Sequence, residues 1–163
     1  MANFRKVFPS YDWDDVMYVN QIINLPIVMG VNNVGFMKNV PNEEVKSCDA
    51  AIRRWIDNNM VGCSCLVLFV GERTYQSRWV KYELEQAISK GMGLLKIDIT
   101  GMTTGYRTSR QGIDPIAYHH LETFPNGYLF GHYSVKSYRW TAFDRPQDLI
   151  GSWIEDACTR AYK

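Results

Sequence analysis

The fold can be read from CLVLFVGERTYQSRWVKYELEQAISKGMGLLKIDIT, residues 65–100. It opens with a continuously apolar run that stops at Gly71, which is typical of a strand covered on both faces. Residues 94–100 predict a second strand, and the residues from Arg78 to Gly91 have the period of an amphipathic helix. A strand, a helix and a second strand in this order predict two parallel strands joined by a right-handed crossover.

Glu83 stands on the apolar side of this predicted helix. At about 100° per residue, with Trp79 at zero, the apolar residues fill an arc from about 0° to about 180°, and Glu83 falls at about 40°. A carboxylate on a core-facing stripe is costly unless a partner or a cavity receives its charge. Two interpretations follow from the pattern. Glu83 is either an edge residue whose head reaches water or a site carboxylate at the mouth of a pocket.

The alternation of strands and helices continues before this stretch. Residues 5–11 predict a short strand, and Pro9 indicates that the end of this strand leaves the regular ladder. Asp14 and Asp15 then begin a short predicted helix, and residues 27–36 predict a weak strand or a loop. Residues 42–60 predict one helix, which Asn42 caps and whose apolar stripe includes Cys48.

After residue 100 the pattern is less regular. Residues 101–133 carry glycines, threonines and two prolines, and they predict a long irregular insertion. Residues 138–143 predict a last short strand, and Pro146 stands near the first turn of a closing helix.

These elements predict an α/β fold, a single doubly wound domain over residues 1–163 whose central parallel sheet contains residues 5–10, 65–70 and 94–99. Ligands of such folds bind outside the carboxyl ends of the strands, where the strand order reverses. FPSYDWDD follows the first strand and GERTYQSRW follows the 65–70 strand, so we expect these two segments to face one crevice. Glu83 lies about one and a half turns into the helix after the second segment, which favours a site carboxylate.

The composition excludes several classes of partner. The formal net charge is +1, with 18 basic and 17 acidic residues, so neither nucleic acid nor a membrane surface is an expected partner. The amino terminus has no apolar signal core, and we expect a cytoplasmic protein. We expect no bound metal, because no histidines and cysteines have ligand spacing, and we expect four reduced thiols, at Cys48, Cys63, Cys65 and Cys158.

Three segments carry a resemblance to a known family: KVFPSYDWDD (6–15), RRWID (53–57) and residues 65–99. Together they resemble the TIR-like family of small prokaryotic proteins, which includes the TIR-like sensor protein of Thoeris anti-phage defence. The resemblance covers nearly the whole chain and is weakest across residues 101–133. It implies a flavodoxin-like fold and an enzyme that splits the bond between nicotinamide and ribose in NAD. NAD is then the substrate, and no cofactor is implied.

The resemblance also assigns a role to Glu83. The catalytic carboxylate of the family is the glutamate of its R-W-V-x-Y-E stretch, which matches residues 78–83. The implied product is a cyclic or conjugated ADP-ribose messenger rather than plain ADP-ribose. The implied partners are a downstream effector reached through that product, a phage-derived trigger and a second copy of the chain.

The resemblance adds candidate substrate contacts. Those in the loop after the first strand are Ser10, Tyr11, Asp12 and Trp13, and those elsewhere are Phe36 and Trp79. Structural roles stay open for these residues: Tyr11, Trp13, Phe36 and Trp79 can pack in the core, and Asp12 can cap the following helix. Asp12 and Pro9 depart from the family pattern, which leaves the substrate contacts less defined than the fold.

Three other functions compete with an NAD-splitting enzyme. A TIR-type adaptor binds partners without chemistry, but it has no need of a carboxylate at Glu83. A phosphoacceptor receiver has the same fold, but it needs an aspartate at the end of its third strand, where this chain has Val70-Gly71-Glu72. A nucleoside deoxyribosyltransferase would use similar carbon–nitrogen bond chemistry on a different substrate.

Overall fold

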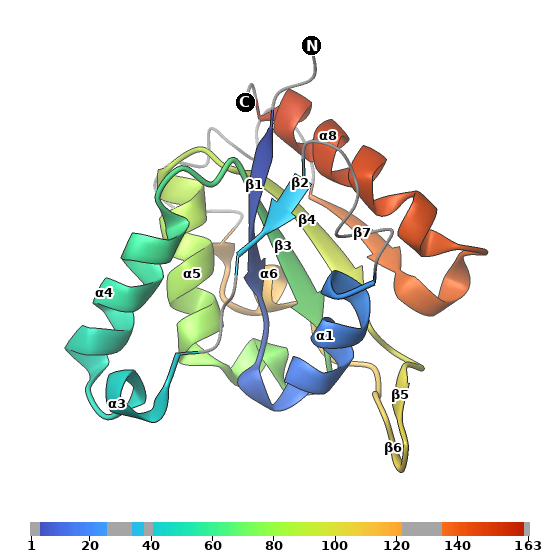
Figure 1. Ribbon diagram of the computed structural model, residues 1–163, viewed down its shortest axis with the longest axis horizontal. Coiled ribbons are helices and arrows are strands. Elements are labelled where there is room, and N and C mark those ends of the chain that lie inside the picture. Colours follow the sequence, from blue (N-terminus) through green and yellow to red (C-terminus); the bar gives the residue numbers. More distant parts are fainter. Residues whose placement is uncertain (1–3, 26–33, 38–40, 122–134, 162–163) are drawn as a thin grey trace.

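The computed structural model describes residues 4–25, 34–37, 41–121 and 135–161. In this part of the chain a parallel sheet of five strands has the order β2-β1-β3-β4-β7 (Figure 1). The strands are β1 (Arg5–Ser10), β2 (Val34–Phe36), β3 (Cys65–Val70), β4 (Gly93–Asp98) and β7 (Lys136–Arg139).

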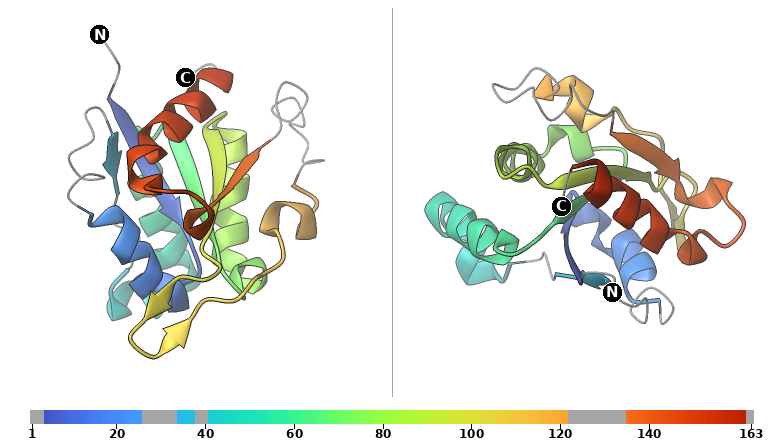
Figure 2. Two further views of the ribbon diagram at one scale, coloured as in Figure 1. Left: turned by 90° about the vertical axis from the view of Figure 1, so that its right-hand side faces the viewer. Right: turned by 90° about the horizontal axis from the view of Figure 1, so that it is seen from above.

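Helices cover both faces of this sheet (Figure 2). One face carries α1 (Val16–Ile23) and α8 (Ile150–Arg160), and the other carries α4 (Asp49–Met60) and α5 (Arg78–Ser89). The shorter elements are α3 (Glu43–Lys46), α6 (Pro115–Tyr118), the hairpin strands β5 (Thr103–Thr104) and β6 (Arg107–Thr108), and the 3-10 turns η1 (Trp13–Asp15), η2 (Thr74–Gln76), η4 (Trp140–Ala142) and η5 (Pro146–Asp148).

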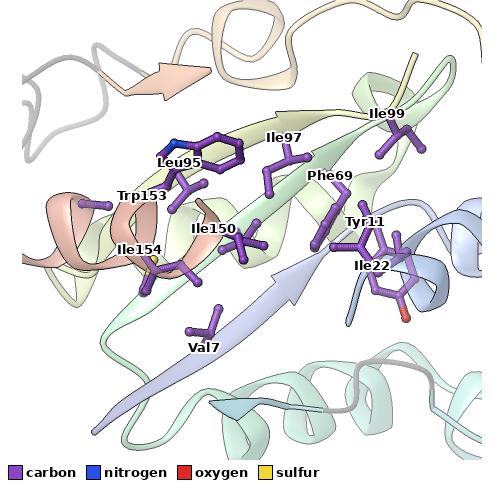
Figure 3. Close-up of a cluster of buried hydrophobic side chains, with 14 of the residues drawn as sticks. Val7, Tyr11, Ile22, Phe69, Leu95, Ile97, Ile99, Ile150, Trp153 and Ile154 are labelled. Atoms are coloured by element: carbon purple, nitrogen blue, oxygen red, sulfur yellow. The ribbon is translucent and has the colours of Figure 1, made fainter. Parts of the chain in front are cut away.

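The buried β3 strand explains the two-layered core. All six of its residues are buried, and successive side chains point to opposite faces of the sheet. Val67 and Phe69 therefore join the cluster under α1 and α8, which Figure 3 shows, and Leu66 and Leu68 join the cluster under α4 and α5. Because both faces are covered, the strand needs apolar residues at every position.

The predicted fold class is confirmed. β1 and β3 have the predicted bounds, β4 begins one residue before the predicted start, and all three strands are parallel. The order β2-β1-β3-β4-β7 corresponds to the 2-1-3-4-5 order of flavodoxin-like folds. Ser77 caps the helix between β3 and β4, because its Oγ accepts a hydrogen bond from the Val80 amide at 3.2 Å.

The single helix predicted over residues 42–60 is wrong. Asn42 caps α3 as expected, but α3 ends after one turn and α4 starts at Asp49. Ser47 Oγ donates a hydrogen bond to the Glu44 carbonyl at 2.6 Å, a local bond of the kind that competes with helix continuation. Cys48 consequently has extended backbone (φ −145°, ψ 128°) and is exposed rather than part of the apolar stripe.

Two strand predictions also need correction. Pro9 does not leave the ladder, because it is paired with Val67 inside β1. The backbone carbonyl of Val7 points toward the side of β2 and accepts a hydrogen bond from the Met37 amide. The backbone nitrogen of Pro9, two residues later, points to the same side, but β2 has already ended there. The strand predicted at 138–143 is instead β7, which ends at Arg139. There the chain turns into η4, where Thr141 Oγ1 donates to the Thr100 carbonyl at 2.8 Å.

The segment predicted to be an irregular insertion contains regular elements where the structure describes it. Residues 101–121 hold the β5–β6 hairpin and α6, and residues 122–133 lie outside the described residues. Figure 1 shows the hairpin projecting beyond the carboxyl ends of the strands. Among the helices of the described ranges, none combines the length and the apolar character that crossing a membrane requires.

Candidate functional site

The carboxyl ends of β1 and β3 form the point at which the strand order reverses. From β1 the chain first adds β2 on one side and then β3 on the other. Loops that leave neighbouring strands in opposite directions open a crevice, and ligands of doubly wound folds bind there. The loop after β1 and the turn after β3 are the two segments that the sequence predicted to face one crevice.

Glu83 lies inside the protein on the sheet-facing side of α5. It is 1% exposed, and its helix neighbours Val80, Leu84 and Ala87 are also buried. An edge glutamate whose head reaches water is therefore excluded. Removing a carboxylate from water carries a large cost, and proteins tolerate such a cost most often at functional sites.

Tyr11 lies near enough to this carboxylate to feel its charge, and Ser10 precedes Tyr11 at the carboxyl end of β1. Burial raises the pKa of the Tyr11 phenol, and the negative charge of Glu83 raises it further. Ser10 is fully buried and follows Phe8 by two residues, so its side chain points toward the α4 and α5 face. No residue in the described part of the chain accepts or donates a hydrogen bond at Ser10 Oγ. Ser10, Tyr11 and Glu83 form what we call the buried group.

A cleft of about 380 Å³ lies next to the segment that follows the buried group in the sequence, since Asp12, directly after Tyr11, is one of its lining residues. It lies between η1, the turn after β3 and the β5–β6 hairpin, and its lining side chains are all charged: Asp12, Asp14, Asp15, Glu72, Arg73 and Arg107. We call this space the charged cleft. It combines carboxylates, which accept hydrogen bonds from hydroxyl groups, with guanidinium groups, which donate to phosphates.

Arg107 fastens the hairpin to the loop after β1. Its Nη1 donates to the Asp14 carbonyl at 3.2 Å, its Nη2 lies 3.5 Å from Asp15 Oδ1, and its guanidinium stands 5.4 Å from the ring centre of Tyr18. Asp15 itself is 3% exposed. Burial raises the pKa of Asp15 to about 6, and nearby Asp12 adds to the rise while Arg107 opposes it.

Asp12 and Trp13 combine structural roles with their position at the site. Asp12 Oδ1 accepts a hydrogen bond from the Asp14 amide at 3.2 Å, so the predicted capping role is confirmed, and the same side chain lines the charged cleft. Burial raises the pKa of Asp12. Trp13 packs against both core clusters, with Lys46 Nζ 5.1 Å from its ring centre.

Phe36 and Trp79 lie apart from the charged cleft. Phe36 belongs to β2 rather than to a loop, and its ring centre is 6.5 Å from that of Phe69, which also lies 6.5 Å from the ring centre of Tyr11. Trp79 stands on the α4 side of α5, between the guanidinium groups of Arg78 at 4.7 Å and Arg53 at 6.0 Å. The core-packing interpretation fits both residues, because each packs against a core cluster, and Trp79 also borders a separate group of charged side chains.

Several residues of the charged cleft were not predicted to be site residues. Asp14, Asp15 and Arg73 lie in the two segments that were expected to face one crevice, but none of them was named as a candidate site residue. The place of Arg107 in the cleft could not be predicted from the sequence, because only the folded hairpin brings it to the loop after β1. In the described ranges no three His, Cys, Asp or Glu side chains are arranged to hold a metal ion.

Comparisons with known proteins show which family the chain belongs to. The sequence model of the family described as "Thoeris protein ThsB, TIR-like domain" matches residues 8–104. A curated protein of Bacillus cereus (strain MSX-D12), named "Putative cyclic ADP-D-ribose synthase ThsB1", is 24% identical over 144 residues, which is 85% of this chain and 75% of the relative. The matched residues include the carboxyl-terminal half of β1, the buried group and the turn after β3. The chain therefore belongs to the TIR-like family of Thoeris ThsB proteins.

Proposed function

We propose that the protein splits NAD between nicotinamide and ribose and transfers the ADP-ribosyl group to a nucleophile of the same molecule or of another small molecule. The product is a cyclic or conjugated ADP-ribose signal in Thoeris defence. Membership of the family and the name of the Bacillus cereus relative support the class of reaction. The observation that carries the proposal is the buried Glu83 carboxylate beside Tyr11 at the carboxyl end of β1.

A buried carboxylate suits this chemistry because positive charge develops in the transition state. Nicotinamide leaves NAD as a neutral molecule from a cationic ring, so it needs little acid catalysis, and the ribose becomes an oxocarbenium-like cation. A carboxylate stabilises such a cation in glycosidases, and a low local dielectric strengthens the attraction. Glu83 then accepts the proton of the incoming hydroxyl or amine.

The neighbours of Glu83 supply polar groups of the kind that a ribose needs. The hydroxyl of Ser10 has no hydrogen-bond partner among the described residues, so it is available to a sugar hydroxyl. Tyr11 keeps its proton at neutral pH, because burial and Glu83 raise its pKa, and it therefore acts as a donor rather than as a base. Asp12 connects these residues to the charged cleft.

The burial of Glu83 also bears on regulation. At 1% exposure the carboxylate touches a substrate only after surrounding side chains have moved. An enzyme in this state has low activity until binding energy from another source shifts the equilibrium. We accordingly expect a trigger from the infecting phage to open the site, and the product to reach a separate effector protein.

Incubation of the purified protein with NAD, followed by mass spectrometry, tests the proposal. If the protein is inactive alone, extract of phage-infected cells is added, with extract alone as the blank. Glu83→Gln should lose product formation by on the order of 10²-fold or more, as removal of one preorganised electrostatic group does. Glu85→Gln is the matched control, because Glu85 points about 200° away around the helix, where it pairs with Lys81 at 3.9 Å.

Two outcomes would overturn the proposal. Wild-type rates from a folded Glu83→Gln variant would show that the carboxylate is not catalytic. The absence of nicotinamide release from the wild type under every activating condition, with NAD-independent binding to a Thoeris partner, would favour the adaptor function instead.

A further inference from the structure

The charged cleft has an excess of negative charge. Four carboxylates and two guanidinium groups line it, so its formal charge is −2 when all of them are ionised. The carboxylates of Asp14 and Glu72 are exposed, and Asp15 is buried against Arg107. A ligand that enters this space therefore meets acceptors for hydroxyl groups and only a limited capacity for additional phosphate charge.

The two guanidinium groups approach the cleft from different segments. Arg73 follows β3, and Arg107 comes from the β5–β6 hairpin, where the Asp14 carbonyl and the Tyr18 ring hold it in place. Two such groups suit the diphosphate of a dinucleotide. The carboxylates suit a ribose, because an acidic side chain at the carboxyl end of a strand binds the 2′-hydroxyl in other doubly wound folds.

We infer that the charged cleft binds the adenosine ribose and diphosphate of the dinucleotide and excludes a 2′-phosphate, so that the protein uses NAD and discriminates against NADP. This inference rests on the proposed function, and it adds the substrate preference and the residues that set it. Asp14 and Glu72 provide the repulsion, and Arg73 and Arg107 provide the attraction for the diphosphate that both dinucleotides share. The discrimination is electrostatic, because the 2′-phosphate adds nearly two negative charges beside carboxylates.

A competition experiment tests the inference on the intact protein. Equimolar NAD and NADP are mixed under the condition that gives product with the wild type, and mass spectrometry follows the loss of each. We expect NAD to be consumed about 10-fold faster or more, because like charges separated by a few ångströms weaken binding by about this factor. The preference should shrink as NaCl is raised, because salt screens exposed charges.

Matched variants identify the residues responsible. The double variant Asp14→Asn with Glu72→Gln should raise the consumption of NADP relative to NAD severalfold, whereas Glu85→Gln, outside the cleft, should leave the ratio unchanged. Arg73→Ala and Arg107→Ala should slow the consumption of both dinucleotides without changing the ratio. ADP-ribose added as a competitor should inhibit the wild type more strongly than its 2′-phosphate does.

The outcomes separate the inference from the proposed function. If neither dinucleotide loses nicotinamide, the proposed function fails. If both are consumed at equal rates, or if neutralising Asp14 and Glu72 leaves the ratio unchanged in a folded protein, the enzyme stands and the assignment of the charged cleft is wrong.

Discussion

The two ends of β1 differ in how fully their buried polar groups are hydrogen-bonded. At the amino end, Arg5 is 7% exposed and donates two hydrogen bonds to the carboxylate of Glu155, at 3.0 and 2.9 Å. At the carboxyl end, the hydroxyl of Ser10 bonds to no described residue, and the carboxylate of the buried Asp15 lies 3.5 Å from the guanidinium of Arg107. Satisfied polar groups contribute to stability, whereas groups that the protein leaves poorly satisfied cost stability and are available to a ligand.

Two glycines show the same difference in packing. At the amino end, a Cβ on Gly93 would lie 2.8 Å from the backbone carbonyl of Ala157, so α8 rests directly on β4. At the carboxyl end, a Cβ on Gly71 would meet the carboxylate of Asp15, a side chain that can rotate. Gly93 therefore packs against rigid backbone, whereas the closest contact of Gly71 is with a side chain that can rearrange when a ligand binds.

The largest effect on stability is expected for Gly93→Ala. The new methyl group must push α8 from the sheet, and we expect a loss of about 3 kcal/mol or more in the free energy of unfolding. Gly71→Ala should cost about 1 kcal/mol, because only the Asp15 side chain must move, but it should weaken nucleotide binding. Urea unfolding at pH 7.5 measures both losses. A larger loss for Gly71→Ala would contradict the proposed difference between the two ends.

Asp15→Asn should stabilise the protein at neutral pH. Because the pKa of Asp15 rises to about 6 on folding, from an ordinary value of 3.8, the folded state holds a proton that the unfolded chain releases between these values. Stability consequently falls as the pH rises from about 4 to about 6, and an asparagine avoids this loss. We expect a gain on the order of 2 kcal/mol at pH 7.5.

The comparison with pH 4 is the control for this variant. There Asp15 is protonated in the folded protein, and the difference in the free energy of unfolding between Asp15→Asn and wild type should largely vanish. If the variant is less stable than wild type at pH 7.5, the pairing with Arg107 outweighs the cost of burying the carboxylate.

Much of this site followed from local patterns in the sequence. The continuous apolar run of β3 and the helical period after it predicted the positions of β3 and α5, and Glu83 was identified because a carboxylate contradicts the helical stripe on which it lies. Trp79 stands at the border of that stripe, and it packs against the core cluster under α4 and α5, as its structural interpretation predicted. Arg107 and the burial of Asp15 depend on tertiary contacts of the hairpin, which no local pattern contains.

Glu155→Gln tests the satisfied end of β1 with a smaller effect. The hydrogen bond from Arg5 lowers the pKa of Glu155 below its ordinary 4.5, so the ionised pair stabilises the folded state above that value and the contribution is lost as the pH falls through the lowered pKa. Glu155 is half exposed, so we expect a loss of about 1 kcal/mol at pH 7.5. Urea unfolding should show this difference shrinking in acid; a constant difference would mean that charge is not its cause.

The smallest effects are expected for the cysteines, which report how closed the amino end is. Cys48 is exposed at the start of α4, so Cys48→Ser should change the free energy of unfolding by less than about 0.5 kcal/mol, and its thiol should react within the folded protein.

Burial raises the pKa of Cys63 to about 11, which slows its reaction. Cys65 of β3 and Cys158 of α8 are fully buried beside each other, and they should react with a maleimide only when the whole protein unfolds. Four thiols should therefore be counted after denaturation, and the reaction of the last two in native buffer should follow the urea dependence of global unfolding. If Cys158 reacts with a weaker urea dependence than global unfolding, α8 opens locally, and its backbone contact with β4 at Gly93 is not rigid.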